Sequence, residues 1–202
     1  MPDRRVTPAQ APAQAPAAGR GQRVLGIDPG LAATGWAVLG PGPQRPCVIA
    51  CGTIHTTPAD DGAARLVKIA RGLRDAIGAH APQVAAVEQA LVARSARSAL
   101  ALGEARGVAL LAAAEAGLPV HEYLPMHVKQ AVTGYGHAEK GQVERMVARL
   151  VTQDGAPGSS HAADAIAIAL CHIGRGGLPR PASRARRSTR AAWTAFAAGA
   201  GR

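Results

Sequence analysis

Two acidic side chains stand where apolar runs of the chain end. Asp28 closes the run VLGID and precedes a Pro-Gly pair, and Glu88 closes the run VAAVE. A buried strand normally excludes a carboxylate unless something offsets its charge. If the two strands are adjacent and parallel, both carboxylates emerge at the same sheet edge, where open α/β folds place their sites. The pattern predicts a functional site at that edge.

The last predicted helix contributes two more groups that can bind a metal ion. His161 and Asp164 are three residues apart, which places them on one helical face, and Asp164 interrupts the apolar run AADAIAIAL. Divalent cations with oxygen ligands can hold such like charges together. The four groups together therefore predict a site for divalent cations.

Each of these residues also has an explanation that involves no chemistry. Asp28 suits an Asx-type turn before Pro-Gly, and Glu88 suits an exposed strand end. His161 and Asp164 suit the first turn of a helix, where the dipole favours an acid. All of these explanations must hold at once if there is no site, so the combination favours the metal site.

The elements that position these groups follow from the spacing of apolar residues. The first three predicted strands form hairpins, and the later strands alternate with helices, which indicates a mixed sheet covered by helices. The predicted strands are 23–28, 34–39, 47–56, 83–88 and 118–123, and the predicted helices are 60–79, 95–116, 125–134, 137–151 and 159–174.

Two of these elements have features of their own. Strict alternation in the strand 47–56 would place Cys47, Ile49 and Cys51 on one face. The helix 95–116 is apolar or small on nearly every side, with Gly103 and Gly107 one turn apart. That composition suits either a dimer interface or a helix enclosed within one domain.

The 202 residues suffice for one domain with a full core. The net charge of +10 resides mostly at the ends, because residues 23–174 carry thirteen basic and twelve acidic groups. We expect a disordered Ala/Pro-rich extension over 1–22, a folded domain over 23–174 and a flexible Arg-rich tail over 175–202. No apolar run is long enough for a membrane span, no export signal is evident, and the three cysteines match no disulfide or metal spacing. These features predict a cytoplasmic protein.

Four segments, in order and spacing, resemble the RuvC-type Holliday junction resolvases: GIDPGLAATGWAV, VEQALVARSARSALALGEARG, PMHVKQAVTGYGHAEKGQV and SHAADAIAIAL. The resemblance covers roughly residues 23–174. It implies an α/β, RNase H-like mixed five-stranded sheet flanked by helices, in a single domain. It also implies a structure-specific endonuclease that resolves four-way DNA junctions by symmetric paired nicks in homologous recombination and DNA repair.

The resemblance further implies that Asp28, Glu88, His161 and Asp164 form the catalytic tetrad. They would bind two divalent cations per subunit, Mn²⁺ or Mg²⁺, for two-metal-ion phosphodiester hydrolysis. The family usually has Asp where this chain has His161. Because imidazole is a softer ligand than carboxylate, we expect Mn²⁺ to support activity better than Mg²⁺.

The predicted DNA contacts rest on local cations, since the folded domain is nearly neutral. The resemblance places the family's phosphate-binding pair at Lys129 and Lys140. Arg94 and Arg97 flank the loop after Glu88, where they either bind DNA or form a solvated helix start. Leu91 occupies the position of an aromatic wedge at the junction centre.

The resemblance implies three partners, namely four-way junction DNA, a second copy of the chain in a homodimer and the RuvA/RuvB branch-migration complex. Other functions stay open on the residues alone. One is another RNase H-like nuclease that acts on branched nucleic acid. A second is a non-catalytic junction-binding protein, given His161 in the tetrad. A third is an actin-like ATPase, since DPGLAATG is similar to a phosphate loop.

Overall fold

Five strands form one mixed sheet in the order β3-β2-β1-β4-β5. The structure is a computed structural model that describes residues 21–89, 95–152 and 158–175. β1 pairs antiparallel with β2 and parallel with β4, β2 pairs antiparallel with β3, and β4 pairs parallel with β5. The strands are β1 (Val24–Asp28), β2 (Ala33–Gly40), β3 (Cys47–His55), β4 (Val84–Glu88) and β5 (Val120–Tyr123). The predicted mixed sheet of hairpins followed by parallel strands is confirmed.

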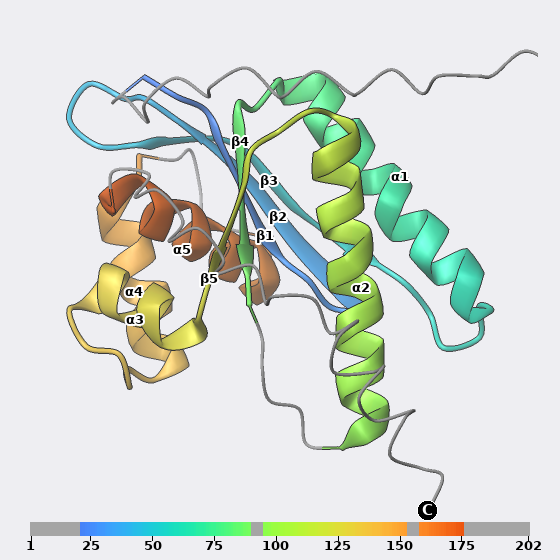
Figure 1. The fold of residues 1–202 in the computed structure, drawn as a ribbon. Coiled ribbons are helices and arrows are strands. Elements are labelled where there is room, and N and C mark those ends of the chain that lie inside the picture. The colour runs from blue at the N-terminus through green and yellow to red at the C-terminus, as the bar shows by residue number, and fades with distance from the viewer. Residues whose placement is uncertain (1–20, 90–94, 153–157, 176–202) are drawn as a thin grey trace, which may run out of the picture.

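Helices cover both faces of this sheet (Figure 1). They are α1 (Gly62–His80), α2 (Ala96–Glu115), α3 (Pro125–Thr133), α4 (Lys140–Leu150) and α5 (Ser160–Gly174). α5 lies directly on the sheet with α3 and α4 beside it, and α1 and α2 cover the opposite face. Because both faces are covered, β1 and β4 are buried along their whole length except for the last residue of each strand. These two residues are Asp28 and Glu88.

The ends of the helices follow the signals in the sequence. Asp61 accepts a hydrogen bond from the Ala63 amide at the start of α1, and Ser159 accepts one from the Ala162 amide at the start of α5. Gly117 follows α2 with a φ of 70°, a conformation that favours glycine. The predicted helix 137–151 begins later, at Lys140, because a capping box between Glu139 and Gln142 starts it there.

The predicted arrangement of β3 is wrong at one point. Leu39 pairs with Val48 and Val38 pairs with Ala50, so Ile49 is an extra residue in a β-bulge. The bulge shifts the alternation by one residue, which brings Val48 and Cys51 onto the core under α5 and leaves Ile49 40% exposed. Cys47, Ile49 and Cys51 therefore do not share one face.

α2 is not enclosed by the described part of the chain. It packs against its neighbours through Ala105, Ala109, Ala112 and Ala113. On its other side Leu100 is 65% exposed and Leu111 is 53% exposed. The helix thus presents an apolar stripe that nothing in the described ranges covers. No described helix is both long enough and apolar enough to span a membrane.

Candidate metal centre

The last residues of β1 and β4 lie at one edge of the sheet. The strands run parallel, with Ile27 paired to Val87, so the next residue of each strand, Asp28 and Glu88, falls at the same level. Side chains at this level stand at the carboxyl end of both strands, where the strands are no longer covered on all sides. The structure thus places the two predicted carboxylates together.

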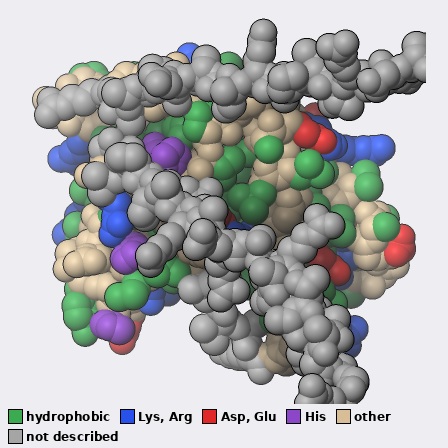
Figure 2. Space-filling model, viewed as in Figure 1, with side chains coloured by type: hydrophobic (Ala, Val, Ile, Leu, Met, Phe, Trp, Pro, Cys, Tyr) green, Lys and Arg blue, Asp and Glu red, His purple; other side chains and the backbone are tan. Residues whose placement is uncertain are grey.

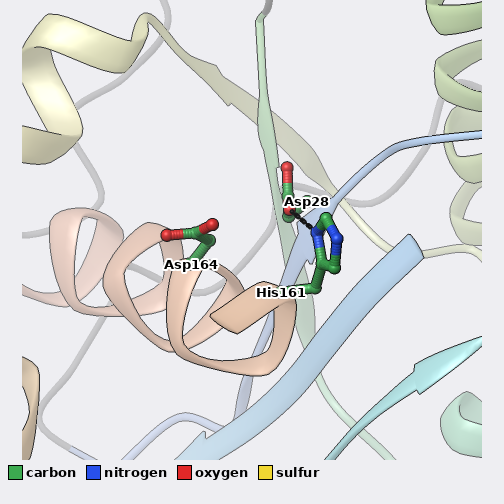
Figure 3. A group of neighbouring side chains, drawn as sticks. All are labelled: Asp28, His161 and Asp164. Atoms are coloured by element: carbon green, nitrogen blue, oxygen red, sulfur yellow. Dashed lines mark hydrogen bonds and ion pairs between the residues drawn. The ribbon is translucent and has the colours of Figure 1, made fainter. Parts of the chain in front are cut away.

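α5 brings His161 and Asp164 to the same edge. One ligand atom from each of Asp28, His161 and Asp164 lies within 4.8 Å of the others. His161 Nδ1 is 3.0 Å from Asp28 Oδ2. Figure 3 marks this contact with a dashed line. Two carboxylates and an imidazole are the ligand types that Mn²⁺ and Mg²⁺ sites use, with oxygen in the majority. The arrangement therefore fits a divalent cation.

Two glycines allow α5 to approach the sheet this closely. A side chain at Gly35 of β2 would collide with the carbonyl oxygen of His161, and one at Gly26 of β1 would collide with that of Ala165. The serine that caps α5 is held as well, because Ser159 Oγ lies 2.5 Å from Thr53 Oγ1 on β3. Backbone contact between helix and sheet therefore fixes the height of His161 over Asp28.

Glu88 lies outside the group of three, yet its charge interacts with theirs. Burial raises the pKa of Glu88 to about 7, and the negative charges of Asp28 and Asp164 add to the rise. Burial also raises the pKa of Asp28; the hydrogen bond with His161 opposes that rise, and the charge of Asp164 adds to it. A nearby cation stabilises the charged form of buried, mutually repelling carboxylates such as these. The types of ligand atom and the raised pKa values of the carboxylates thus both favour a bound cation.

Lys140 already supplies one positive charge to the centre. Its Nζ is 2.7 Å from Asp164 Oδ2, and this hydrogen bond raises the pKa of Lys140. A basic residue at position 140 was predicted to contact DNA phosphate, and no feature of the sequence indicates this ion pair. A cation bound to Asp164 would compete with the ammonium group, which would then be available to another anion.

The other predicted DNA contacts differ in their surroundings. Lys129 on α3 is half-buried, and its charge lowers the pKa of Glu88, so it faces the same centre. Arg97 is exposed in the first turn of α2. Leu91 and Arg94 lie outside the described residues.

Comparison with known proteins gives consistent results. A family model described as crossover junction endodeoxyribonuclease RuvC matches residues 24–172. The crossover junction endodeoxyribonuclease RuvC of Parvibaculum lavamentivorans is 55% identical over 152 residues, which cover 75% of this chain and 86% of that protein.

Two solved structures extend the comparison. The structure of T. thermophilus RuvC in complex with a Holliday junction substrate matches with a TM-score of 0.72 at 36% identity, and the match covers 77% of this chain and 95% of that one. The yeast mitochondrial Holliday junction resolvase Ydc2 matches with a TM-score of 0.57 at 12% identity, over 77% of this chain and 80% of that one, and shows the fold alone. All four predicted metal ligands fall within the matched region.

Proposed function

The chain belongs to the RuvC family of crossover junction endodeoxyribonucleases, and we propose that Asp28, Glu88, His161 and Asp164 bind the divalent cations with which it cuts four-way DNA junctions. The convergence of Asp28, His161 and Asp164 within 4.8 Å, beside Glu88 at the end of the neighbouring strand, carries this proposal. The actin-like ATPase alternative has no support in the comparisons, which match residues 24–172 to the nuclease family.

The charge of the ligand carboxylates, counted without the neighbouring Lys129 and Lys140, suits two cations. The three carboxylates carry a total charge of −3, and two divalent cations carry +4. One phosphodiester of DNA then brings the centre to neutrality, whereas a single cation would leave it at −2 with the phosphate bound. A neutral centre is the state that a half-buried site favours.

Each residue has a distinct role in this proposal. Asp28 lies at the end of β1, beside β4 and within 4.8 Å of the α5 pair, so it would be the ligand that the cations share. His161 would supply a nitrogen ligand, and a cation on Asp164 would free Lys140 from its ion pair. The bound cations would lower the pKa of a water molecule and stabilise the leaving 3′ oxygen. Lys129 and the released Lys140 would hold the phosphate.

A synthetic four-way junction, incubated beside linear duplex of the same sequence, tests the function. Mn²⁺ or Mg²⁺ should give paired symmetric nicks in the junction and none in the duplex, and a chelator should prevent them. Equal cutting of both substrates would favour another RNase H-like nuclease. Tight junction binding without nicks in either metal would favour a non-catalytic binding protein.

His161 is expected to set the preference for the metal. We expect nicking to be several-fold faster in Mn²⁺ than in Mg²⁺, because the imidazole nitrogen binds Mn²⁺ better. His161→Asp should shift the ratio of the two rates towards Mg²⁺. The rates are measured on the same junction at saturating metal, and an identical ratio in both proteins would contradict the role of His161.

We infer that the protein acts as a homodimer, since cutting two strands symmetrically needs two centres related by a two-fold axis. The exposed stripe of α2 carries Leu100, Gly103, Gly107 and Leu111, which lie three or four residues apart and permit close helix packing. This stripe is the candidate interface.

Leu100→Glu tests the interface. A charge buried there without a partner should weaken the dimer by about 100-fold or more and replace paired cuts with single nicks. Sedimentation equilibrium measures the first effect and junction cleavage the second. Val67→Glu, at a 47% exposed position on α1, is the control and should leave both unchanged. A Leu100→Glu protein that stays dimeric would exclude this face.

We also infer that the chain has the three parts that its composition predicts, namely an extension over 1–22, the nuclease domain over 23–174 and a tail over 175–202. The ranges 1–20 and 176–202, which contain most of the two predicted extensions, lie outside the described residues. The RuvA/RuvB branch-migration complex is the protein partner that the family implies.

A further inference from the structure

A polar pocket lies between α4 and the loop that precedes it. Its volume is about 300 Å³, at the lower end for sites that bind small organic groups. Ala138 and Met146 form its apolar part, and Thr133, Tyr135 and Gln142 surround them with polar atoms. Tyr135 is 61% exposed, so its ring stands at the rim. The function proposed above assigns no role to this pocket.

One face of α4 supplies most of the pocket. Gln142, Arg145, Met146 and Arg149 line it and follow the spacing i, i+3, i+4 and i+7. The opposite face of the helix carries Val143 and Val147, which are buried in the core. The two arginines are therefore held on an outward face by the packing of α4. No carboxylate is among the residues that line the pocket.

The cations of α4 lie on two sides of the helix, with Lys140 on the side of the metal centre and Arg145 and Arg149 on the other. Lys140, the first residue of the helix, contacts Asp164. The side chain of Arg145 extends back to the first turn of α4. Its Nη1 is 3.4 Å from the position that a Cβ at Gly141 would occupy. Figure 2 shows basic and histidine side chains over the part of the molecule where α3 and α4 lie.

The C-terminal end of α4 lies at the opposite end of the sheet from Asp28. Thr152, just after α4, bridges to Cys47 at the start of β3, and Arg45 donates a hydrogen bond to the carbonyl oxygen of Arg149. From Lys140 to Arg149 the helix rises by about 13 Å, which is about four base-pair steps of duplex DNA.

We propose that this face of α4 binds the sugar–phosphate backbone of one DNA arm, about four nucleotides from the scissile phosphate. Arg145 and Arg149 would each hold a phosphate, and Tyr135 would pack against a sugar or base beside them. The positive charge of the two arginines favours DNA over the Arg-rich residues 175–202 of this chain as the occupant. The inference rests on the proposed function, since it assumes that the junction enters at the metal centre.

The double variant Arg145→Gln/Arg149→Gln tests this. Loss of two phosphate contacts should reduce the slope of log affinity against log salt by about 1.8, which corresponds to roughly 60-fold weaker binding at 0.1 M salt. Affinity is measured by fluorescence anisotropy on a four-way junction in chelator. The matched control, Lys68→Gln/Arg71→Gln, removes two exposed cations from α1 on the opposite face of the sheet and should keep the original slope. An unchanged slope in the Arg145/Arg149 variant overturns the proposal.

Replacing single DNA phosphates by uncharged methylphosphonates shows which phosphates Arg145 and Arg149 contact. A methylphosphonate about four nucleotides from the scissile phosphate should weaken binding of the unmodified protein and have little effect on the Arg145/Arg149 variant. Equal sensitivity of both proteins at every position overturns the proposal. At saturating protein the variant should still nick the junction, because the metal ligands are intact. Failure of the unmodified protein to nick any junction would instead contradict the proposed function, so the two failures are distinguishable.

Discussion

Asp28→Asn is expected to abolish nicking of a four-way junction while the protein still binds it. The side chain stands at the end of β1, 3.0 Å from His161 and next to Glu88 on the adjacent strand, so no other described carboxylate can replace it as a shared ligand. An amide cannot bridge two cations as a carboxylate does. We expect the nicking rate in saturating Mn²⁺ to fall by about 10³-fold or more, of the order seen when a key charge-stabilising group is removed. Binding in chelator should be unchanged or tighter, because one negative charge near the DNA is lost.

Single-turnover cleavage of a labelled junction measures the rate, and anisotropy measures the binding. Asp75→Asn, which removes one exposed acid from α1, is the matched control and should cut at the original rate. An Asp28→Asn protein that retains more than about a tenth of the rate would show that Asp28 is not a metal ligand. Loss of binding together with activity would indicate misfolding instead, which unfolding curves of the two variants would reveal.

The position of the centre could be predicted from the sequence because local patterns determine it. Asp28 and Glu88 end apolar runs, and strands of that composition become buried and parallel. His161 and Asp164 share a helical face through their spacing alone. The capping serine and the apolar run after it identify α5 without tertiary information. Each of these signals depends on a few neighbouring residues.

The features that the sequence did not predict depend on contacts between distant segments. The bulge at Ile49 arises from how β3 pairs with β2, and both alternation patterns fit the sequence equally well. Lys140 has a long flexible side chain, and its partner, Asp164, lies 24 residues further along the chain. His172, which is 1% exposed, shares a hydrogen bond of 2.8 Å with Tyr123 Oη. These two residues also come from distant segments of the chain. Side-chain direction at such positions is set by packing.

A cluster of buried carboxylates that repel one another should destabilise the protein when no metal is bound. Glu88 has an ordinary pKa of 4.5, and burial together with the charges of Asp28 and Asp164 raises it to about 7 in the folded protein. Below pH 4.5 the residue is protonated in both the folded and the unfolded state, so it has no effect. Between pH 4.5 and about 7 the unfolded state loses its proton first. The free energy of unfolding therefore decreases as the pH rises through this window.

Glu88→Gln should remove this penalty. At 1.36 kcal/mol per pKa unit, the metal-free variant should be more stable than the original protein by about 3 kcal/mol at pH 8, and the difference should vanish near pH 4. Urea unfolding in chelator across this range measures it. Glu104→Gln, at an exposed position on α2, is the control and should leave the pH profile unchanged.

Added Mn²⁺ should reverse the order of stability at pH 8. On the proposed function the cation would bind the folded state of the original protein and stabilise it by mass action, whereas the Glu88→Gln variant would lack one ligand and gain less. Because binding would release the proton of Glu88, the apparent metal affinity should rise with pH up to about 7 and then level off. If Glu88→Gln were no more stable than the original protein at pH 8 in chelator, Glu88 would not carry the charge repulsion that the proposed metal centre requires.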